Sequence, residues 1–376
     1  MPADQASAIL FYAPMKPPDD PTPSGDREVA RTLVAALECL GHQATLASRL
    51  RAWQRRPDHA ALEELKAQAA AECDRIVSDI TRRRRSPKAF VTYHLYHRAP
   101  DLIGPEIAER LSIPYLVIEA SRALKRSRDD WREHFHLADQ ALQRADAVIA
   151  LQGDDLDGLT GVIEAARLHH IPPFLDLSGF APARTPDDRP DGPCQLLTVG
   201  MMRAGDKAAS YQLLAEALSR LDSMRWRLTI AGDGPARAKI EPLFPKDRTT
   251  FLGRVPRARL ADVYRQADLF VWPAIREAFG LVFLEAQASG LPVIGARRGG
   301  VPNVVADGET GLLVPEGDVE AFSEAVTTLI RDPERRQRMG VAARARVLAE
   351  HDLAIGVARL GAILDATIAR HGETAR

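Results

Sequence analysis

The sequence is poor in cysteine and has no long hydrophobic run. Its 376 residues include three cysteines, Cys39, Cys73 and Cys194, which lack both the spacing of a zinc site and the even number typical of a disulfide framework. No stretch approaches the roughly 20 apolar residues that span a membrane, and the first residues are too acidic and too short of apolar character for a secretory signal. We therefore expect a protein of the reducing cytoplasm.

An excess of charge of one sign is also absent. The chain has 50 lysines and arginines against 51 aspartates and glutamates, which gives a formal net charge of −1 at pH 7. Because a nucleic-acid binder usually carries a basic surface, no nucleic-acid partner is expected. The one basic run, TRRRRSPK at 81–88, would suit an anionic membrane surface. We interpret it as a solvated turn and keep peripheral membrane contact as an alternative.

Short apolar runs alternate with segments of helical period along the whole chain. In the first half, runs typical of strands lie at 8–13, 89–95, 115–120 and 147–152. The segment 26–41 has its apolar residues on one helical face and ends at a glycine. This alternation predicts βαβ units and parallel sheets.

A second series of strand-type runs follows a segment at 171–193 that is rich in proline, glycine and aspartate. These runs lie at 195–200, 227–232, 249–253, 269–274, 292–296 and 311–315. The fold class is therefore α/β, with two Rossmann-like doubly wound domains facing a central cleft, where open sheets of this kind bind ligands.

Domain boundaries follow from the same pattern. We expect an N-terminal domain at 1–180, a linker at 181–194 and a C-terminal domain at 195–352, followed by a helix at 353–376 that returns to the N-terminal domain. A length of 376 residues fits two domains of roughly 150 to 200 residues each.

The segment REAFGLVFLEAQASG at 276–290 carries two glutamates, Glu277 and Glu285, eight positions apart. A strand precedes it and a helix is predicted to begin near Gly280, so the first helical amide groups lack partners and attract phosphate. A carboxylate would repel phosphate, so the targets of the two glutamates are neutral hydroxyls on either side. A sugar nucleotide has this layout, with a pyrophosphate between a ribose and a hexose.

This segment resembles the E-x7-E motif of the retaining glycosyltransferases of family 4, whose two-domain architecture is called GT-B. Other stretches similar to the same family are LLTVGMMRAGDK at 196–207, LTIAGDGP at 228–235, FLGRV at 251–255, the segment 296–318 and DPERRQRMG at 332–340. The resemblance covers nearly all of residues 195–350, and it is weaker in the first half, where it rests on 14–42 and 145–151.

The resemblance implies a role for each part of the motif. Glu277 would bind hydroxyls of the donor sugar, and Glu285 would hold the ribose hydroxyls. The backbone that would line the phosphates belongs to Phe279, Gly280, Leu281 and Val282.

Cations and a base site are implied as well. Arg203 and Lys207 would neutralise the leaving diphosphate, because negative charge grows there as the glycosidic bond breaks. The nucleotide base would lie near Gly253, Arg254 and Val255, bound mainly through the backbone.

No metal and no cofactor are expected beside the sugar nucleotide, because side-chain cations replace a metal in this family. Asp155 and Asp157 have the D-x-D spacing of metal-dependent glycosyltransferases, but we interpret them as caps of a helix. Gly232 and Gly234 begin a GxGxxG pattern typical of dinucleotide binding, in which Arg237 occupies the third position and cannot give the close packing that glycine gives.

In the first half, Gly25 lies between a strand and a helix and could bring backbone close to a bound group, and Asp26 is predicted to cap that helix. Glu119 stands where family members commonly have a catalytic histidine. His94 and His97 stand near the carboxyl end of the preceding strand run, and either could orient the acceptor or bind a hydroxyl of the donor sugar.

These features predict a retaining, metal-independent hexosyltransferase that moves a sugar from a nucleoside diphosphate sugar to an acceptor hydroxyl. The acceptor, whether glycan, lipid or small molecule, is not defined by the sequence. Two alternatives stay open. One is a catalytically weak nucleotide-sugar-binding partner of another transferase, motivated by Glu119; the other is an NAD-dependent oxidoreductase, motivated by the glycines at 232 and 234.

Overall fold

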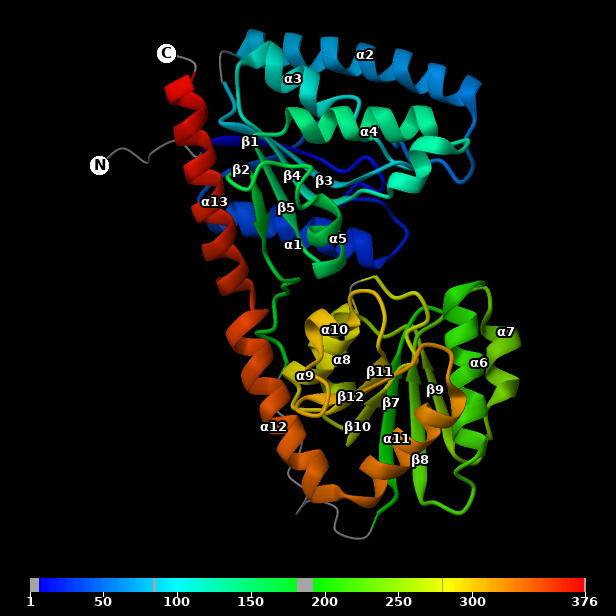
Figure 1. Cartoon of the computed structure of the whole chain (residues 1–376). Helices are drawn as coiled ribbons and strands as arrows, with labels where there is room; N and C mark the ends of the chain where they lie inside the picture. The colour runs from blue at the N-terminus through cyan, green and yellow to red at the C-terminus, as the bar shows by residue number, and fades with distance from the viewer. Residues whose placement is uncertain (1–6, 84–85, 181–191, 279, 375–376) are drawn as a thin grey trace. The chain divides into compact units, whose positions relative to one another are not determined.

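The computed structural model describes residues 7–83, 86–180, 192–278 and 280–374. The chain forms two compact units (Figure 1). Unit 1 comprises Met1–Pro172 and Leu353–Arg376, and unit 2 comprises Pro173–Asp352. Each unit is a parallel sheet covered by helices, so the predicted α/β class with two Rossmann-like domains is confirmed.

In the described part of unit 1, six parallel strands pair in the order β2-β1-β3-β4-β5-β6. They are β1 (Ala8–Tyr12), β2 (Gln43–Leu46), β3 (Ala89–Tyr96), β4 (Tyr115–Ser121), β5 (Ala147–Ala150) and β6 (Leu168–His170). The helices are α1 (Gly25–Cys39), α2 (His59–Arg83), α3 (Gly104–Leu111), α4 (Arg132–Arg144), α5 (Gly153–Leu159) and α13 (Leu353–Thr374), with a short 3-10 helix at Leu124–Arg128. Figure 1 shows α2, α3 and α4 on one side of the sheet and α1 and α5 on the other.

The local sequence explains these elements. Strands β3, β4 and β5 are almost continuous apolar runs because helices cover both of their faces. Helix α1 buries Val29, Leu33 and Leu37 at helical spacing, and Ser24 caps its start by accepting a hydrogen bond from the amide of Arg27. The expected cap at Asp26 is wrong, because the Asp26 side chain lies in the first turn and points to another partner.

In the described part of unit 2, six parallel strands pair in the order β12-β11-β10-β7-β8-β9. They are β7 (Cys194–Val199), β8 (Trp226–Ala231), β9 (Thr249–Gly253), β10 (Leu269–Val271), β11 (Val293–Ala296) and β12 (Gly311–Val314). The longer helices are α6 (Asp206–Ser219), α8 (Arg257–Tyr264), α9 (Leu281–Ala288), α11 (Val319–Arg331) and α12 (Pro333–Glu350), and the short ones are α7 (Arg237–Ile240) and α10 (Val301–Val304).

The structure differs from the sequence pattern in two ways. Strands β2 and β6 were not predicted, because each has at most four residues and lies at an edge of the sheet, where burial and apolar character are low. Residues 173–180, expected in the N-terminal domain, belong to unit 2. There the amide of Leu175 donates to the carbonyl of His351, and the Phe180 ring packs against Tyr264.

The expected linker and the basic run lie partly outside the described residues. Most of the expected linker, at 181–191, lies outside the described residues, and Cys194 already belongs to β7. Helix α2 extends to Arg83, and residues 84–85 of the basic run lie outside the description. Helix α13 packs along α1, where Leu40 occupies the space that a side chain at Gly361 would need.

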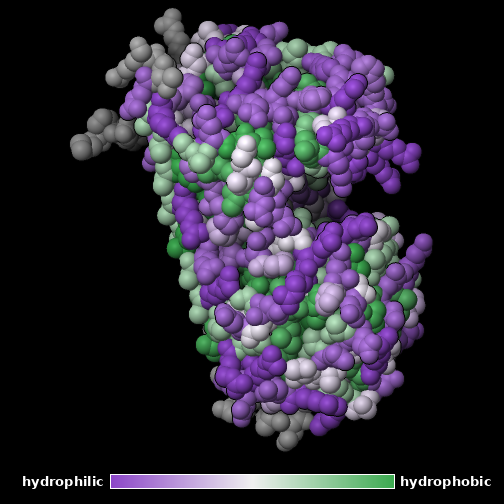
Figure 2. Space-filling model, viewed as in Figure 1, coloured by the Kyte–Doolittle hydropathy of each residue, from purple (hydrophilic) through white to green (hydrophobic). Residues whose placement is uncertain are grey.

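The surface is mainly hydrophilic in the view of Figure 2, with hydrophobic residues in small separate groups. Among the described residues, the helices are too short or too polar to cross a membrane.

Candidate functional site

Each sheet has a topological switch point, a pair of neighbouring parallel strands after which the chain connects to opposite sides of the sheet order. In unit 2 this point lies between β7 and β10, and in unit 1 it lies between β1 and β3. Loops that leave such a pair diverge, so the carboxyl ends of the two strands border a crevice in which α/β proteins bind ligands. Several predicted site residues lie at these two points, among them Lys207 and Glu277 in unit 2 and His94 in unit 1.

In unit 2, Lys207 in the first turn of α6 forms an ion pair with Glu277 in the loop after β10. The Lys207 Nζ also lies 5.3 Å from the centroid of the buried Trp272 ring, whose Nε1 donates to Glu277 at 3.4 Å. Both charged side chains are mostly buried, with exposed fractions of 28% and 18%. The structure therefore brings the predicted sugar-binding acid and the predicted phosphate-binding cation together, and it adds Trp272, which sequence reasoning missed.

The loop that carries Glu277 is held in a strained conformation. Ala274 and Arg276 both have positive φ, of 56° and 48°, which is uncommon for residues with a side chain. Ser210 accepts a hydrogen bond from the amide of Ile275 at 3.0 Å, and Glu316 accepts one from the amide of Arg276 at 2.7 Å. Neighbouring elements thus fix the backbone on which Glu277 stands, as expected for a side chain that must keep one position.

Helix α9 begins directly after this loop, as predicted. Gly280 is its N-terminal cap residue with φ 65°, and a side chain there would collide with Phe283. Leu281 and Val282 form the first turn, whose amide groups have no acceptor within the helix and attract anions. Phe279 lies outside the described residues. A helix start that attracts anions thus follows directly after the loop that carries Glu277, the ion-pair partner of Lys207.

Glu285 lies inside α9 and is almost completely buried. Its carboxylate accepts a hydrogen bond from the Tyr264 hydroxyl at 2.9 Å and pairs with Arg257 at 3.2 Å. Burial, with the charge of Glu285 second, raises the pKa of Tyr264 well above its usual value, so the hydroxyl stays a donor. Binding of ribose by Glu285 remains a prediction, and it requires hydroxyls to share or displace these partners.

The remaining cation and the predicted base site flank the same strand ends. Arg203 lies half-buried in the loop between β7 and α6. Gly253 ends β9 with φ 67°, and its carbonyl accepts a hydrogen bond from the amide of Gly232 at 2.8 Å. Arg254 and Val255 line a cavity of about 570 Å³ that runs along the sheet beside α8 and reaches back to the start of β7. None of the residues around the Lys207 pair lines this cavity.

The glycines of the GxGxxG pattern have a packing role. Gly232 and Gly234 have φ near 155°, and a side chain at either position would collide with the backbone carbonyl of Gly200 or Met202. The amide of Met202 donates to the carbonyl of Asp233 at 3.0 Å. Glycine is needed where the loops after β7 and β8 pack against each other, which accounts for the pattern without a dinucleotide.

In unit 1, the imidazole of His94 near the end of β3 is hydrogen-bonded to Asp26. The distance between Nδ1 of His94 and the carboxylate oxygen of Asp26 is 3.1 Å. Burial acts to lower the pKa of His94, but the hydrogen bond and charge of Asp26 and the charges of Glu119 and Asp155 outweigh it and raise the pKa. Burial acts in the opposite direction on Asp26, and its interactions with His94 lower the pKa of that carboxyl. Because Asp26 holds Nδ1, Nε2 is the nitrogen that can meet a bound group.

Glu119 ends β4 in a buried position with φ 61°. It accepts hydrogen bonds from the amide of Leu151 at 3.1 Å and the side chain of Gln152 at 2.7 Å. Burial and then the charge of Asp155 raise the pKa of Glu119 to about 8. Glu119 therefore holds a proton at neutral pH.

Asp155 is not a helix cap, contrary to the sequence interpretation. Its carboxylate accepts a hydrogen bond from Ser121 at the end of β4. Burial, as the largest effect, raises the pKa of Asp155 against the hydrogen bonds of Ser121 and Glu119. Gln152 is the N-terminal cap residue of α5, and its side chain makes no capping hydrogen bond. Asp155 thus lies with Asp26, His94 and Glu119 in one group, which we call the acidic cluster of unit 1.

The two other predicted residues of unit 1 differ from His94. His97 packs edge-on against Trp131 with 5.2 Å between ring centroids, and burial, followed by the charges of Arg126 and Arg98, lowers the pKa of His97 to about 4. Its environment is therefore separate from the acidic cluster. Gly25 starts α1 with open space around it, so packing within the chain does not require glycine there.

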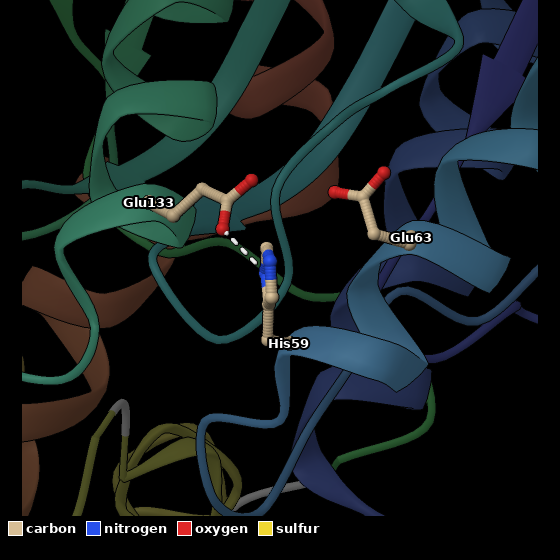
Figure 3. A group of neighbouring side chains, drawn as sticks. All are labelled: His59, Glu63 and Glu133. Carbon is tan, nitrogen blue, oxygen red and sulfur yellow. Dashed lines mark ion pairs between the residues drawn. The ribbon is translucent and has the colours of Figure 1, made fainter.

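A cluster of possible metal ligands lies on the surface of unit 1, where His59 and Glu133 form an ion pair beside Glu63 (Figure 3). Lys66 binds both carboxylates, with Nζ 2.7 Å from Glu63 and 2.5 Å from Glu133. The ammonium group already occupies the place between the two acids, so we interpret the cluster as a surface ion-pair network.

Part of the chain is similar to known sequences. Residues 189–346 match the model of the family described as glycosyl transferases group 1. Sulfoquinovosyl transferase SQD2 of Arabidopsis thaliana is 39% identical over 138 residues, which cover 36% of this chain and 27% of that protein. A D-inositol 3-phosphate glycosyltransferase of Kribbella flavida is 36% identical over 225 residues, which cover 54% of this chain and 53% of that protein. The chain thus spans about half or less of the length of these relatives.

Solved structures extend the similarity to the whole fold. A sucrose-phosphate synthase from Thermosynechococcus elongatus superposes with a TM-score of 0.75 at 21% identity and covers 97% of this chain and 100% of that one. The Anabaena protein HepE in complex with UDP superposes with a TM-score of 0.69 at 16% identity, over 95% of this chain and 99% of that one. Residues 189–346 are therefore similar to the glycosyl transferases group 1 family, in a chain that has the GT-B fold of two Rossmann-like domains.

Proposed function

We propose that this protein transfers a sugar from a nucleoside diphosphate sugar to an acceptor hydroxyl. The observation that carries the proposal is the Lys207 and Glu277 pair beside the start of α9, inside the region that matches the group 1 family. A lysine, a helix start and a glutamate around one switch point suit a phosphate flanked by hydroxyls. Related folds that bind UDP and UDP-glucose support the same class of donor.

In this proposal each group has a defined task. Lys207, Arg203 and the first amides of α9 hold the diphosphate, and Glu277 accepts hydrogen bonds from hydroxyls of the transferred sugar. The sugar has to displace part of the bond between Glu277 and Lys207, which frees the cation for phosphate. Glu285 would bind ribose hydroxyls, and the backbone of Gly253 to Val255 would contact the base.

We propose a retaining reaction that needs no metal. The bond between the anomeric carbon and the diphosphate oxygen breaks, and the acceptor oxygen attacks the same face of the sugar. The acceptor proton passes to the departing diphosphate oxygen, so the products are the glycoside and a nucleoside diphosphate. Lys207, Arg203 and the helix start supply the positive charge that stabilises this leaving group. His94 would orient the acceptor through Nε2.

A panel of nucleoside diphosphate sugars with mass detection of the released nucleoside diphosphate tests the proposal. The purified chain is expected to consume one donor with an acceptor present, to do so in the presence of EDTA, and to give a product whose anomeric configuration in the NMR spectrum matches the donor. Binding of nucleoside diphosphate without turnover on any acceptor would favour the alternative function as a binding partner of another transferase. Binding of NAD but of no nucleoside diphosphate would contradict both.

A further inference from the structure

Positive charge gathers on unit 1 where strands β2, β3 and β4 end. Because the sheet is parallel, these strand ends share one edge. The basic edge, as we call it, consists of Arg51, Arg55, Arg56, Arg98, Lys125 and Arg128. In the part of the chain that the structure describes, none of the six forms an ion pair with a carboxylate, whereas their neighbours Arg49 and Arg126 pair with Asp19 and Asp129.

Two arginines of the basic edge lie over tryptophan rings. The guanidinium carbon of Arg51 lies 6.0 Å from the centroid of the Trp53 ring. The guanidinium carbon of Arg98 lies 5.4 Å from the centroid of the Trp131 ring. Stacking orients a guanidinium group and leaves the donors on its rim for other partners. Arg51 uses one of them on the carbonyl of Met15 at 3.1 Å. The remaining donors suit a planar arrangement of acceptor oxygens.

The two stacked pairs belong to one framework. The amide of Gln54, next to Trp53, donates to the carbonyl of Arg98 at 2.9 Å, and its side-chain oxygen contacts His134 at 2.9 Å. His134 in turn packs edge-on against Trp131 with ring centroids 5.1 Å apart. The segments after β2 and β3 and the start of α4 therefore hold Arg51 and Arg98 in fixed relation.

The charges around this framework are predominantly positive. His97 stays neutral between Arg98 and Arg126, because burial and then these two cations lower its pKa. The charge of Arg51 acts on Asp20, which pairs with Lys16 at 3.6 Å, and Asp129, whose charge acts on His97, pairs with Arg126 at 2.7 Å. Because these acids already have cations of their own, an anionic group would meet the six cations of the basic edge that have no carboxylate partner among the described residues.

The basic edge also adjoins the switch point of unit 1. The Trp53 Nε1 donates to the Tyr96 hydroxyl at 3.0 Å, and the Tyr96 ring lies 5.0 Å from the imidazole of His94 between centroids. A small molecule with an anionic group on the arginines can therefore present a hydroxyl to His94.

We propose that the acceptor substrate carries a phosphate group, which Arg51 and Arg98 bind at the basic edge, while an acceptor hydroxyl lies near His94. The inference rests on the proposed function and names the chemical class of its second substrate. Two stacked arginines can each donate two parallel hydrogen bonds to phosphate oxygens, which a lysine cannot do. The phosphate could belong to a soluble ester or to a lipid headgroup, and the experiment separates these sources.

Calorimetric titration of the full chain with inorganic phosphate tests the inference, with nucleoside diphosphate present in excess to fill the donor site. Arg51→Gln and Arg98→Gln are each expected to weaken phosphate binding roughly tenfold, since a hydrogen bond to a charged group is lost. Arg248→Gln is the matched control, because Arg248 lies over the Trp226 ring at 5.3 Å in unit 2. The phosphate affinity of this variant should equal that of the wild type. Arg51→Lys and Arg98→Lys keep the charge and should restore part of the affinity.

A second arm measures cosedimentation with vesicles of phosphatidylcholine alone or mixed equally with phosphatidylglycerol. Binding only to the mixed vesicles, lost in Arg51→Gln and Arg98→Gln, supports the lipid source; phosphate binding without vesicle binding supports a soluble ester. The inference is overturned if neither probe binds, or if binding is the same in the arginine variants and the Arg248 control. Arginine-dependent phosphate binding without turnover of any donor would instead contradict the proposed function and leave the anion site standing.

Discussion

The acids at the switch point of unit 2 face cations, whereas those of unit 1 face one another and a histidine. Glu277 pairs with Lys207, and the carboxylate of Glu285 pairs with Arg257. Glu119 instead lies beside another carboxylate, and its pKa rises to about 8. One fold thus builds a site of ion pairs in unit 2 and a proton-holding site in unit 1, by the choice of partner for each acid.

The largest expected effect is on Glu277. Glu277→Gln should lower kcat/KM for transfer by about a hundredfold to a thousandfold, because a charged acceptor for the sugar hydroxyls is lost. Steady-state kinetics with the donor found by the panel measures it. Glu241→Gln is the control, since Glu241 is a partly exposed acid of unit 2 paired with Arg237, and it should leave kcat/KM unchanged. A kcat/KM equal to that of the wild type in Glu277→Gln would contradict the proposal that Glu277 binds the transferred sugar.

Lys207 should show the next largest effect. Lys207→Met removes a cation from the leaving diphosphate and leaves Glu277 without its ion-pair partner, so kcat should fall about a hundredfold. Lys207→Arg should recover part of this loss. The exposed Lys239 provides a control, since Lys239→Met should change neither kcat nor nucleotide affinity. An unaltered kcat in Lys207→Met would mean that the pair is structural.

Unit 1 should make stability depend on pH. The pKa of Glu119 is about 8 in the folded chain against 4.5 ordinarily, so the folded state binds more protons between these values and stability falls as pH rises from about 4.5 to 8. The pKa shift corresponds to at most about 5 kcal/mol. In Glu119→Gln, melting temperatures recorded by calorimetry across this range should fall less than in the wild type.

An exposed acid of the same unit serves as the reference for this slope. Glu109→Gln on α3 should keep the wild-type pH dependence. Identical slopes in Glu119→Gln and the wild type would show that the acidic cluster does not hold its proton in unit 1, and the contrast between the two units would fail.

Gly25 should give the smallest effect. Space around Gly25 is open, so Gly25→Ala should change the free energy of unfolding by less than about 1 kcal/mol. If a ligand approaches this backbone, KM for one substrate should rise while the melting temperature is unchanged. Equal KM values for both substrates would limit the role of Gly25 to the start of α1.

Most of the fold could be predicted because its strands are buried and apolar. Nine of the ten strands recognised in the sequence are largely buried, and the tenth, the edge strand β9, has an apolar pair at Phe251 and Leu252. Strands β2 and β6 are short edge strands with too few buried side chains to give a pattern. Residues 173–180 were assigned to the wrong domain because their proline-rich composition resembles a linker, although Leu175 and Phe180 bury their side chains in unit 2.

The site of unit 2 was more accessible to sequence reasoning than that of unit 1. Glu277, Gly280 and Glu285 lie within one short segment whose strand, loop and helix can be recognised together. In unit 1 the cluster joins Asp26, His94, Glu119 and Asp155, which are far apart in the chain and meet only because β1, β3, β4 and β5 end at one edge. Asp26 and Asp155 each follow a strand and enter a helix, where an aspartate is more often a cap, so spacing alone assigned them wrongly.

Hydrogen exchange of the full chain with and without the nucleoside diphosphate of the preferred donor tests the central claim most directly. The account predicts slower exchange at the amides of residues 272–286 and 200–208 in unit 2, because the ligand contacts the start of α9 and the loop before α6. Unchanged exchange at both segments under saturating ligand, with protection elsewhere in the chain, would contradict it.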